Sequence, residues 1–158
     1  MRAVNTIISA VMLAFFCFIM SANTYAQDNW WKEKKYRTET KRVKFANCKK
    51  TFVNIGNGFN YANIYEVTPY FGSEVYLSIL IDEKGYYSPD QAKFILDNFF
   101  SNNSVNSFKW RNSNRSENYA FASGKYKFNK NGFIDSHDVS VSLKYVNDIW
   151  IIDQIIIN

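Results

Sequence analysis

The sequence predicts an α+β fold in which helices pack on one side of a curved antiparallel sheet. Two observations carry this prediction. A helix with a full set of N-terminal signals begins after Ser88, and nearly everything beyond residue 105 alternates apolar and polar side chains as strands do. Short turns separate these later strands, so consecutive strands are expected to pair antiparallel as a meander.

Two helices are expected before the first strand. Apolar residues at spacings of three and four predict the first of them over residues 43–55. These residues are Phe45, Cys48, Phe52 and Ile55. Gly56 and Gly58 are expected to end this helix, and Asn60 is expected to cap a second one that ends or kinks at Pro69.

The next helix has the clearest start in the chain. Ser88 is the expected N-cap, Pro89 the first helical residue, and Gln91 the partner that completes a capping box. Its predicted buried stripe consists of Ala92, Ile95, Leu96 and Phe99.

Five segments have the alternation of strands. They are residues 75–81, 108–111, 119–128, 139–145 and 149–157, and Tyr86-Tyr87 adds a short extended piece. The alternation changes phase near Ser123-Gly124, which predicts a bulge there. The last strand is apolar on both faces, so we expect it to be central and covered on both sides.

The first 26 residues have the pattern of a secretory signal peptide. Arg2 precedes an apolar run from Ile7 to Met20, and Thr24-Tyr25-Ala26 provides small residues for cleavage before Gln27. The mature protein is therefore expected to be exported, to the periplasm or beyond. An uncleaved membrane anchor is the alternative, in which Trp30-Trp31 would lie at a membrane interface.

Residues 27–44 are interpreted as a basic leader that precedes a domain over residues 45–158. Residues 28–50 carry nine Lys or Arg against three acidic residues, whereas residues 51–158 carry nine against eleven. The leader is either a solvated segment or a peripheral contact with an anionic membrane through Lys32, Lys34, Lys35 and Arg37. Nucleic acid is not an expected partner, because export would remove it and no recognition motif accompanies the charge.

Several short segments together form a recognisable pattern: residues 75–79, Gly85-Tyr86-Tyr87-Ser88, residues 91–96, Phe99-Phe100-Ser101, Ser107-Phe108, Tyr119-Ala120 and residues 148–152. This pattern resembles a secreted bacterial family catalogued as domain of unknown function 4783, within the nuclear transport factor 2-like superfamily. The resemblance covers roughly residues 45–158 and implies a sheet closed into a cone by helices. It brings no established activity, and sheet-mediated dimers in the superfamily make a homodimer plausible.

Few residues have side chains suited to catalysis, metal binding or disulfide formation. Signal cleavage would leave Cys48 as the single cysteine, so no intrachain disulfide is expected, and neither a cofactor nor a metal site is predicted. His137 is in phase with Val139 and Val141, which places it either at the rim of the core or at the mouth of the cone.

The last strand places a polar side chain on each face, Asp153 on one and Gln154 on the other. Whichever face meets the helices would therefore bury one of them. In superfamily enzymes that resemble ketosteroid isomerases, carboxylates and tyrosines line the cone. That resemblance makes Asp153, with Tyr65, Tyr70 or Tyr119, a candidate site; the alternative is that Asp153 faces solvent or a dimer interface.

Three functions follow from these observations. The first is a non-catalytic exported module that binds a small molecule or a protein partner. The second is an isomerase- or dehydratase-type enzyme with Asp153 or His137 as its base. The third is an envelope-associated structural protein held by the basic leader.

Overall fold

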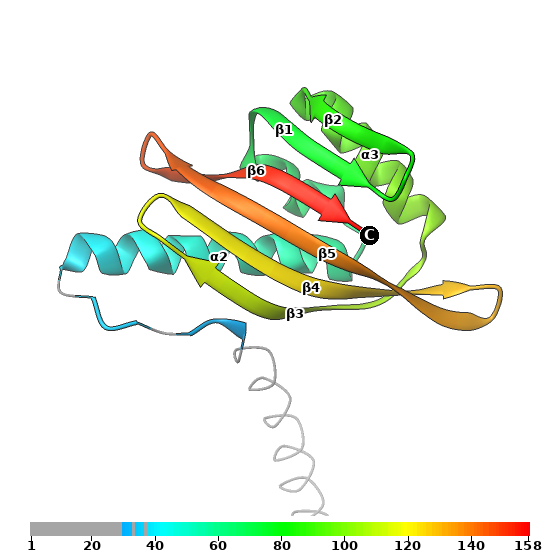
Figure 1. The fold of residues 1–158 in the computed structure, drawn as a ribbon, viewed down its shortest axis with the longest axis horizontal. Helices are drawn as coiled ribbons and strands as arrows, with labels where there is room; N and C mark the ends of the chain where they lie inside the picture. Colours follow the sequence, from blue (N-terminus) through cyan, green and yellow to red (C-terminus); the bar gives the residue numbers. More distant parts are fainter. Residues whose placement is uncertain (1–29, 33, 37) are drawn as a thin grey trace, which may run out of the picture.

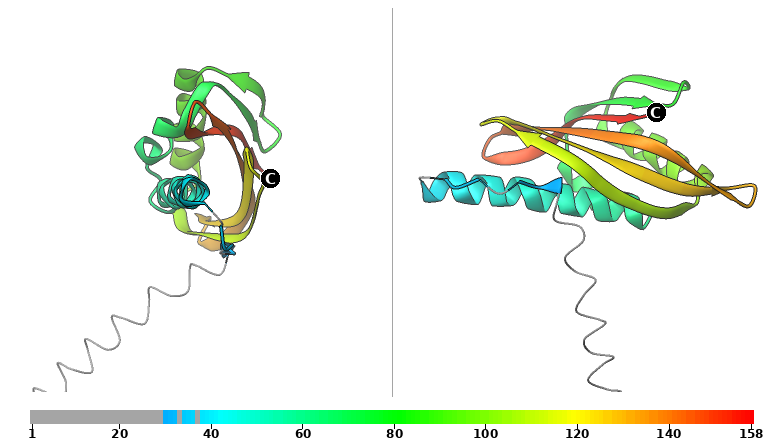
Figure 2. Two further views of the ribbon diagram at one scale, coloured as in Figure 1. Left: turned by 90° about the vertical axis from the view of Figure 1, so that its left-hand side faces the viewer. Right: turned by 60° about the horizontal axis from the view of Figure 1, so that its bottom comes forward.

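The computed structural model describes residues 30–32, 34–36 and 38–158. In chain order, the elements are α2 (Glu39–Asn60), the 3-10 turns η2 (Ile64–Glu66) and η3 (Thr68–Tyr70), β1 (Phe71–Ile79), β2 (Glu83–Tyr87), α3 (Pro89–Asn102), β3 (Val105–Arg115), β4 (Tyr119–Lys130), β5 (Phe133–Val146) and β6 (Ile149–Ile157). The helices lie on one face of a curved six-stranded sheet, as the sequence predicts (Figures 1 and 2).

The strand order across the sheet is β2-β1-β6-β5-β4-β3. The predicted meander is present, because β3 to β6 pair antiparallel with their sequence neighbours. One pair differs from the expected antiparallel sheet: β1 lies parallel to β6, and β2 pairs antiparallel along the other edge of β1. The sheet is therefore mixed, and β6 is central as predicted.

The face of the sheet away from the helices is open in the isolated chain. Ile151 and Ile156 of β6 point to this open face and are only half-buried. The expectation that β6 would be covered on both faces is therefore wrong for a single copy of the chain. The other face of β6 packs against the helices through Trp150, Ile152, Ile155 and Ile157.

Helix α2 is longer than predicted at both ends, and it continues through its two glycines to Asn60. A Cβ on Gly56 would lie 2.6 Å from Nε1 of Trp110, and one on Gly58 would lie 2.5 Å from Cγ2 of Val67. Both glycines therefore allow neighbouring side chains to approach the helix backbone closely. Thr38, rather than a later residue, caps its start by accepting a hydrogen bond from the Lys41 backbone.

The predicted second helix is a pair of 3-10 turns. Asn63 caps the first of them, through a side chain that accepts a hydrogen bond from the Tyr65 backbone at 3.1 Å. Asn60 instead ends α2, and its Oδ1 accepts a hydrogen bond from the Phe108 backbone at 2.9 Å. The side chain expected to start a helix thus joins α2 to β3.

Helix α3 confirms its local signals. Ser88 accepts a hydrogen bond from the Gln91 backbone, and the Gln91 side chain accepts one from the Ser88 backbone. Pro89 is the first helical residue. The buried stripe is Ala92, Leu96, Phe99 and Phe100, with Ile95 half-buried beside it.

The predicted bulge lies in the neighbouring strand. Strand β4 alternates without interruption, since Ala120, Ala122, Gly124, Tyr126 and Phe128 all face the helices. The register instead shifts in β3, between Trp110 and Asn112, opposite Ser123-Gly124. The alternation therefore indicates the correct position along the sheet but the wrong strand.

Residues 30–32 and 34–36, which we call the strap, run alongside α2 (Figure 1). Trp30 and Trp31 are only 4% and 5% exposed, and both rings pack on Phe52 of α2. The Ser113 hydroxyl donates a hydrogen bond of 2.6 Å to the Trp30 carbonyl. These indoles therefore belong to the core of the described structure.

Candidate ligand-binding site

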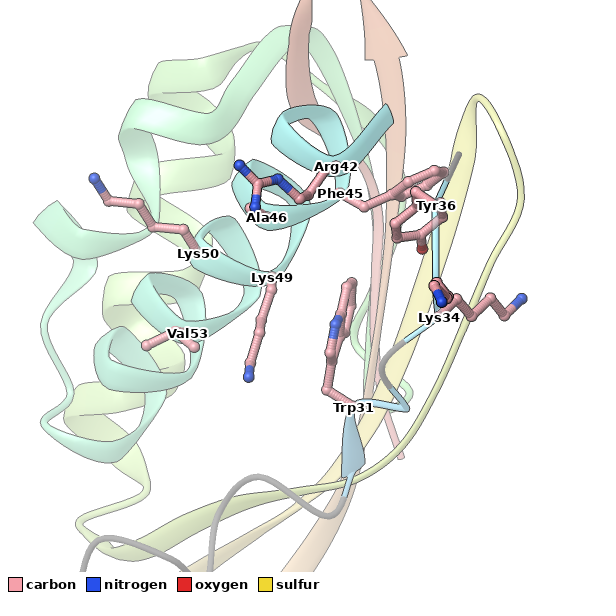
Figure 3. Close-up of a pocket in the computed structure, with 10 residues that line it drawn as sticks. Trp31, Lys34, Tyr36, Arg42, Phe45, Ala46, Lys49, Lys50 and Val53 are labelled. Atoms are coloured by element: carbon pink, nitrogen blue, oxygen red, sulfur yellow. The ribbon is translucent and has the colours of Figure 1, made fainter. Parts of the chain in front are cut away.

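A pocket of about 550 Å³ lies between the strap and α2 (Figure 3). Its lining comes from two segments that are brought together by the packing of Trp30 and Trp31 against the helix. The residues that line it are Trp31, Lys34, Lys35, Tyr36, Arg42, Phe45, Ala46, Lys49, Lys50 and Val53. The volume is sufficient for a small organic molecule.

Aromatic rings form the apolar wall of the pocket. Tyr36 of the strap stacks on Phe45 of α2, with ring centroids 4.6 Å apart and an interplanar angle of 17°. On the side facing the sheet, the Phe45 ring packs against Trp150 of β6. The Trp31 ring lies below the rings of Tyr36 and Phe45 in Figure 3. The side chain of Lys49 lies beside it. The pocket thus presents flat apolar surfaces that suit a hydrocarbon or aromatic group.

The rim of the pocket is cationic. Five basic residues line it, and no Asp or Glu is among its lining residues in the described part of the chain. Arg42 pairs with Glu39 at 2.6 Å in full solvent, and this hydrogen bond raises the pKa of the guanidinium. Lys34 and Lys50 extend outward at the two sides of the pocket (Figure 3). Clustered cations with low-dielectric walls attract anions.

Arg115, at the end of β3, lies behind the same strap. Its side chain is buried against Trp31 and Phe45, and its Nε donates a hydrogen bond of 2.6 Å to the Tyr36 hydroxyl. A smaller pocket of about 240 Å³ lies beside it and shares Lys34, Tyr36 and Phe45 with the larger pocket. The stacked rings of Tyr36 and Phe45 therefore border both hollows.

The sequence alone does not predict this pocket, and the last strand shows how strict alternation can mislead. The register of β5 and β6 shifts beside Ser142, so that Asp153 and Gln154 both turn toward the open face. Neither side chain is buried among the helices, contrary to the expectation that one of them would be. Asp153 pairs with Lys144 at 2.9 Å, and this interaction raises the pKa of Lys144.

The three candidate tyrosines do not gather around Asp153. Tyr119 does lie with it, along a shallow pocket of about 340 Å³ on the open face. Tyr65 is exposed on η2, and Tyr70 is half-buried with its hydroxyl accepting a hydrogen bond of 2.5 Å from Asn54 of α2. The latter two lie on the helical side of the sheet, so the four residues form no single constellation.

His137 lies at the rim of the core, where its phase in β5 places it. Its ring stacks on Phe128 with centroids 4.6 Å apart, and Phe99 packs beside it at 5.9 Å. Burial lowers the pKa of the imidazole below its usual 6.5, which favours the neutral form. Within the described ranges, no three His, Cys, Asp or Glu side chains lie close enough to hold a metal ion.

The basic leader is divided by the fold. Residues 39–44 form the first turns of α2, whereas Lys32, Lys34 and Lys35 are exposed on the strap. Arg37 lies outside the described residues. In the part of the chain that the structure describes, no helix is both long and apolar enough to cross a membrane.

The layered helices and curved sheet are those of a nuclear transport factor 2-like protein. A protein of this class from Shewanella oneidensis MR-1, of unknown function, superposes with a TM-score of 0.51 at 10% identity, over 72% of this chain and 97% of that one. Identity this low shows the fold alone.

Residues 52–158 match the family described as domain of unknown function DUF4783, and the chain belongs to this family. Two solved members are similar to it. The protein from Bacteroides uniformis ATCC 8492 has 23% identity and a TM-score of 0.61, over 66% of this chain and 93% of that one. The protein from Bacteroides fragilis YCH46 has 25% identity and a TM-score of 0.59, over 66% and 94%. No curated protein matches the sequence.

Proposed function

We propose that this protein is an exported, non-catalytic binding module that takes a small anionic ligand in the pocket between the strap and α2. One observation carries the proposal: the pocket combines a wall of aromatic rings with a rim of five basic residues, of which Arg42 pairs with Glu39. An organic anion with a flat apolar body satisfies both parts. The signal-peptide pattern of residues 1–26 supports export.

The two halves of the site contribute differently. Contact with Trp31, Tyr36 and Phe45 provides affinity by removing apolar surface from water. The lysines raise the rate of encounter and select against neutral and cationic molecules. Since Lys35 and Lys50 are exposed, their contribution depends on salt.

A matched pair of dyes tests this proposal. The anionic probe is 1-anilinonaphthalene-8-sulfonate, and its uncharged analogue is N-phenyl-1-naphthylamine. We expect saturable fluorescence enhancement with the anion, weakened by salt, and a much smaller response with the neutral analogue. Equal binding of both dyes, or no saturable binding of the anion, would contradict the proposal.

Two double variants locate the binding. Lys35→Gln with Lys50→Gln removes two charges from the pocket rim, and we expect the dissociation constant of the anionic dye to rise about fivefold or more. Lys109→Gln with Lys127→Gln makes the same change on the open sheet face, where both lysines are exposed. The control is expected to bind as the wild type does, and a similar loss in both would point to net charge rather than to this pocket.

An enzyme using Asp153 receives less support. The carboxylate is held by Lys144 and lies on the open sheet face, away from the aromatic pocket.

An envelope-associated role through Lys32, Lys34, Lys35 and Arg37 is the remaining alternative. Salt-sensitive co-sedimentation with anionic vesicles, lost when these four residues are replaced by Gln, would favour it over a soluble ligand. The intact mass of protein purified from its own host tests cleavage before Gln27.

A further inference from the structure

Arg115 is a buried cation with no carboxylate paired to it among the described residues. Its side chain is 9% exposed. The guanidinium carbon lies 4.2 Å from the centroid of the Trp31 ring, 5.5 Å from that of Phe45 and 5.7 Å from that of Tyr36. These rings offset part of the cost of burying the charge through cation–π attraction, but ring faces do not accept the in-plane hydrogen bonds of a guanidinium.

The hydrogen bonding of this group is incomplete. Nε donates to the Tyr36 hydroxyl, whereas Nη2 is buried and has no hydrogen-bond partner among the residues that the structure describes. The carboxylate that lines the adjoining small pocket belongs to Glu117, which pairs with Lys41 at 2.9 Å. Lys41 also lowers the pKa of Glu117 through that contact. A buried guanidinium that has one nitrogen without an acceptor is costly to the fold.

We propose that Arg115 is the anion-anchoring residue of the binding site and pairs with a carboxylate or phosphate group of the ligand. This inference rests on the proposed function, and it specifies the chemistry of one end of the ligand. The small pocket that Arg115 helps to line adjoins the larger one at Tyr36 and Phe45, so a ligand with its apolar body in the larger pocket has its anionic end at Arg115. The planar fork of a guanidinium suits two parallel hydrogen bonds to such a group.

Binding at this position requires the strap to shift. Nη2 is covered in the structure, and Trp31 and Tyr36 of the strap are the rings that lie over the guanidinium. An anion that reaches Nη2 therefore turns at least one of these side chains aside. Trp31 fluorescence is expected to change as the anion binds, because its ring loses contact with the cation.

Acetate and inorganic phosphate are the probes, each compared with chloride at equal ionic strength. We expect at least one of them to raise the Tm of the purified protein by about 3 °C or more at saturation. Acetate alone would identify a carboxylate ligand and phosphate alone a phosphorylated one. Arg115→Met is expected to abolish this rise in Tm.

Arg111→Met is the matched control, because it makes the same change on the same strand at an exposed side chain. Arg111→Met is expected to retain the wild-type rise in Tm. Comparing the Arg115 variants with it corrects for the general effect of these salts on protein stability. Arg115→Lys keeps the positive charge but removes the planar guanidinium, and we expect a smaller rise in Tm than in the wild type. This variant keeps the test possible if Arg115→Met does not fold. An equal response in the wild type and the Arg115 variants would overturn the inference.

The failure of this inference is distinguishable from that of the proposed function. Saturable binding of the anionic dye, together with no rise in Tm from acetate or phosphate, would overturn the role of Arg115 but not the proposed binding pocket. If the wild-type protein shows no saturable binding of the dye, both the proposed function and the role of Arg115 are overturned.

Discussion

The indole of Trp110 lies against the backbone of α2 at Gly56. Its Nε1 donates a hydrogen bond of 3.0 Å to the carbonyl of Phe52, one turn earlier in the helix. Trp110 is 6% exposed and is surrounded by the rings of Trp30, Phe52 and Phe108. This contact joins α2 to β3, and Trp30 of the strap packs on the same indole.

Replacing Gly56 with Ala is expected to lower the free energy of unfolding by about 1–3 kcal/mol. The new Cβ would lie 2.6 Å from Nε1 of Trp110, and the surrounding rings leave the indole no room to move. Helix propensity alone would give a gain of about 1 kcal/mol, so the sign of the effect separates the two causes. Urea denaturation followed by fluorescence measures it, and Asn57→Ala, at the next and exposed position, is the control with a change within about 0.5 kcal/mol.

Replacing Trp30 with Ala is expected to cost about 3–5 kcal/mol of unfolding free energy. The indole is buried against Trp31, Phe52 and Trp110, so its removal leaves a cavity between the strap and the sheet. The measurement is again urea denaturation, and Lys32→Ala on the exposed side of the strap serves as the control. An unchanged stability in Trp30→Ala would show that the strap does not contribute to the core.

His137 makes the stability of the fold dependent on pH below neutrality. Burial lowers the pKa of the folded imidazole, so between that pKa and 6.5 the unfolded chain binds more protons than the folded one. The stability that the buried neutral imidazole contributes is therefore fully present above pH 6.5, and it is lost as the pH falls through the folded-state pKa. His137→Phe keeps a ring against Phe128, and its unfolding free energy is expected to fall less steeply than that of the wild type from about pH 7 to about pH 5. Parallel curves would contradict this.

Cys48 is expected to be unreactive in the folded protein. Its side chain is fully buried in α2, and burial raises the pKa of the thiol to about 12. Alkylation requires the thiolate and access to it, so we expect the rate at about pH 8 to rise by a factor of about 100 or more on unfolding. The measurement uses a Cys17→Ser chain, in which Cys48 is the single thiol, with iodoacetamide in the presence and absence of urea. Similar rates in both would show that this part of α2 opens readily.

The features that could be predicted from sequence are those that depend on neighbours along the chain. The capping box of Ser88 and Gln91 closes within one turn, and the bounds of the last strand follow from its own run of apolar residues. Gly56 resembles a helix end because its partner, Trp110, is far away in sequence and supplies the reason for a missing side chain. The same limit applies to Asp153, whose direction depends on a register shift against β5.

The pocket escapes prediction for a related reason. Charge alone indicates a basic segment, and nothing local shows that Tyr36 stacks on Phe45 or that Trp30 and Trp31 fold back onto α2. In the sequence, Arg115 is one of several basic residues in a polar strand, and only its burial distinguishes it. Two adjacent tryptophans followed by lysines are compatible both with a membrane interface and with a strap, and only the tertiary structure shows that both indoles pack on Phe52.

The parallel pairing of β1 with β6 has a consequence for how the chain folds. The sixth strand in sequence fills the gap between the first and the fifth, so the sheet cannot close until that segment has been made. Contacts that join such distant segments give a high contact order, which slows folding. Because β6 pairs with both β1 and β5, the β1-β2 pair and the β3-β4-β5 meander stay separate parts of the sheet until this one strand joins them.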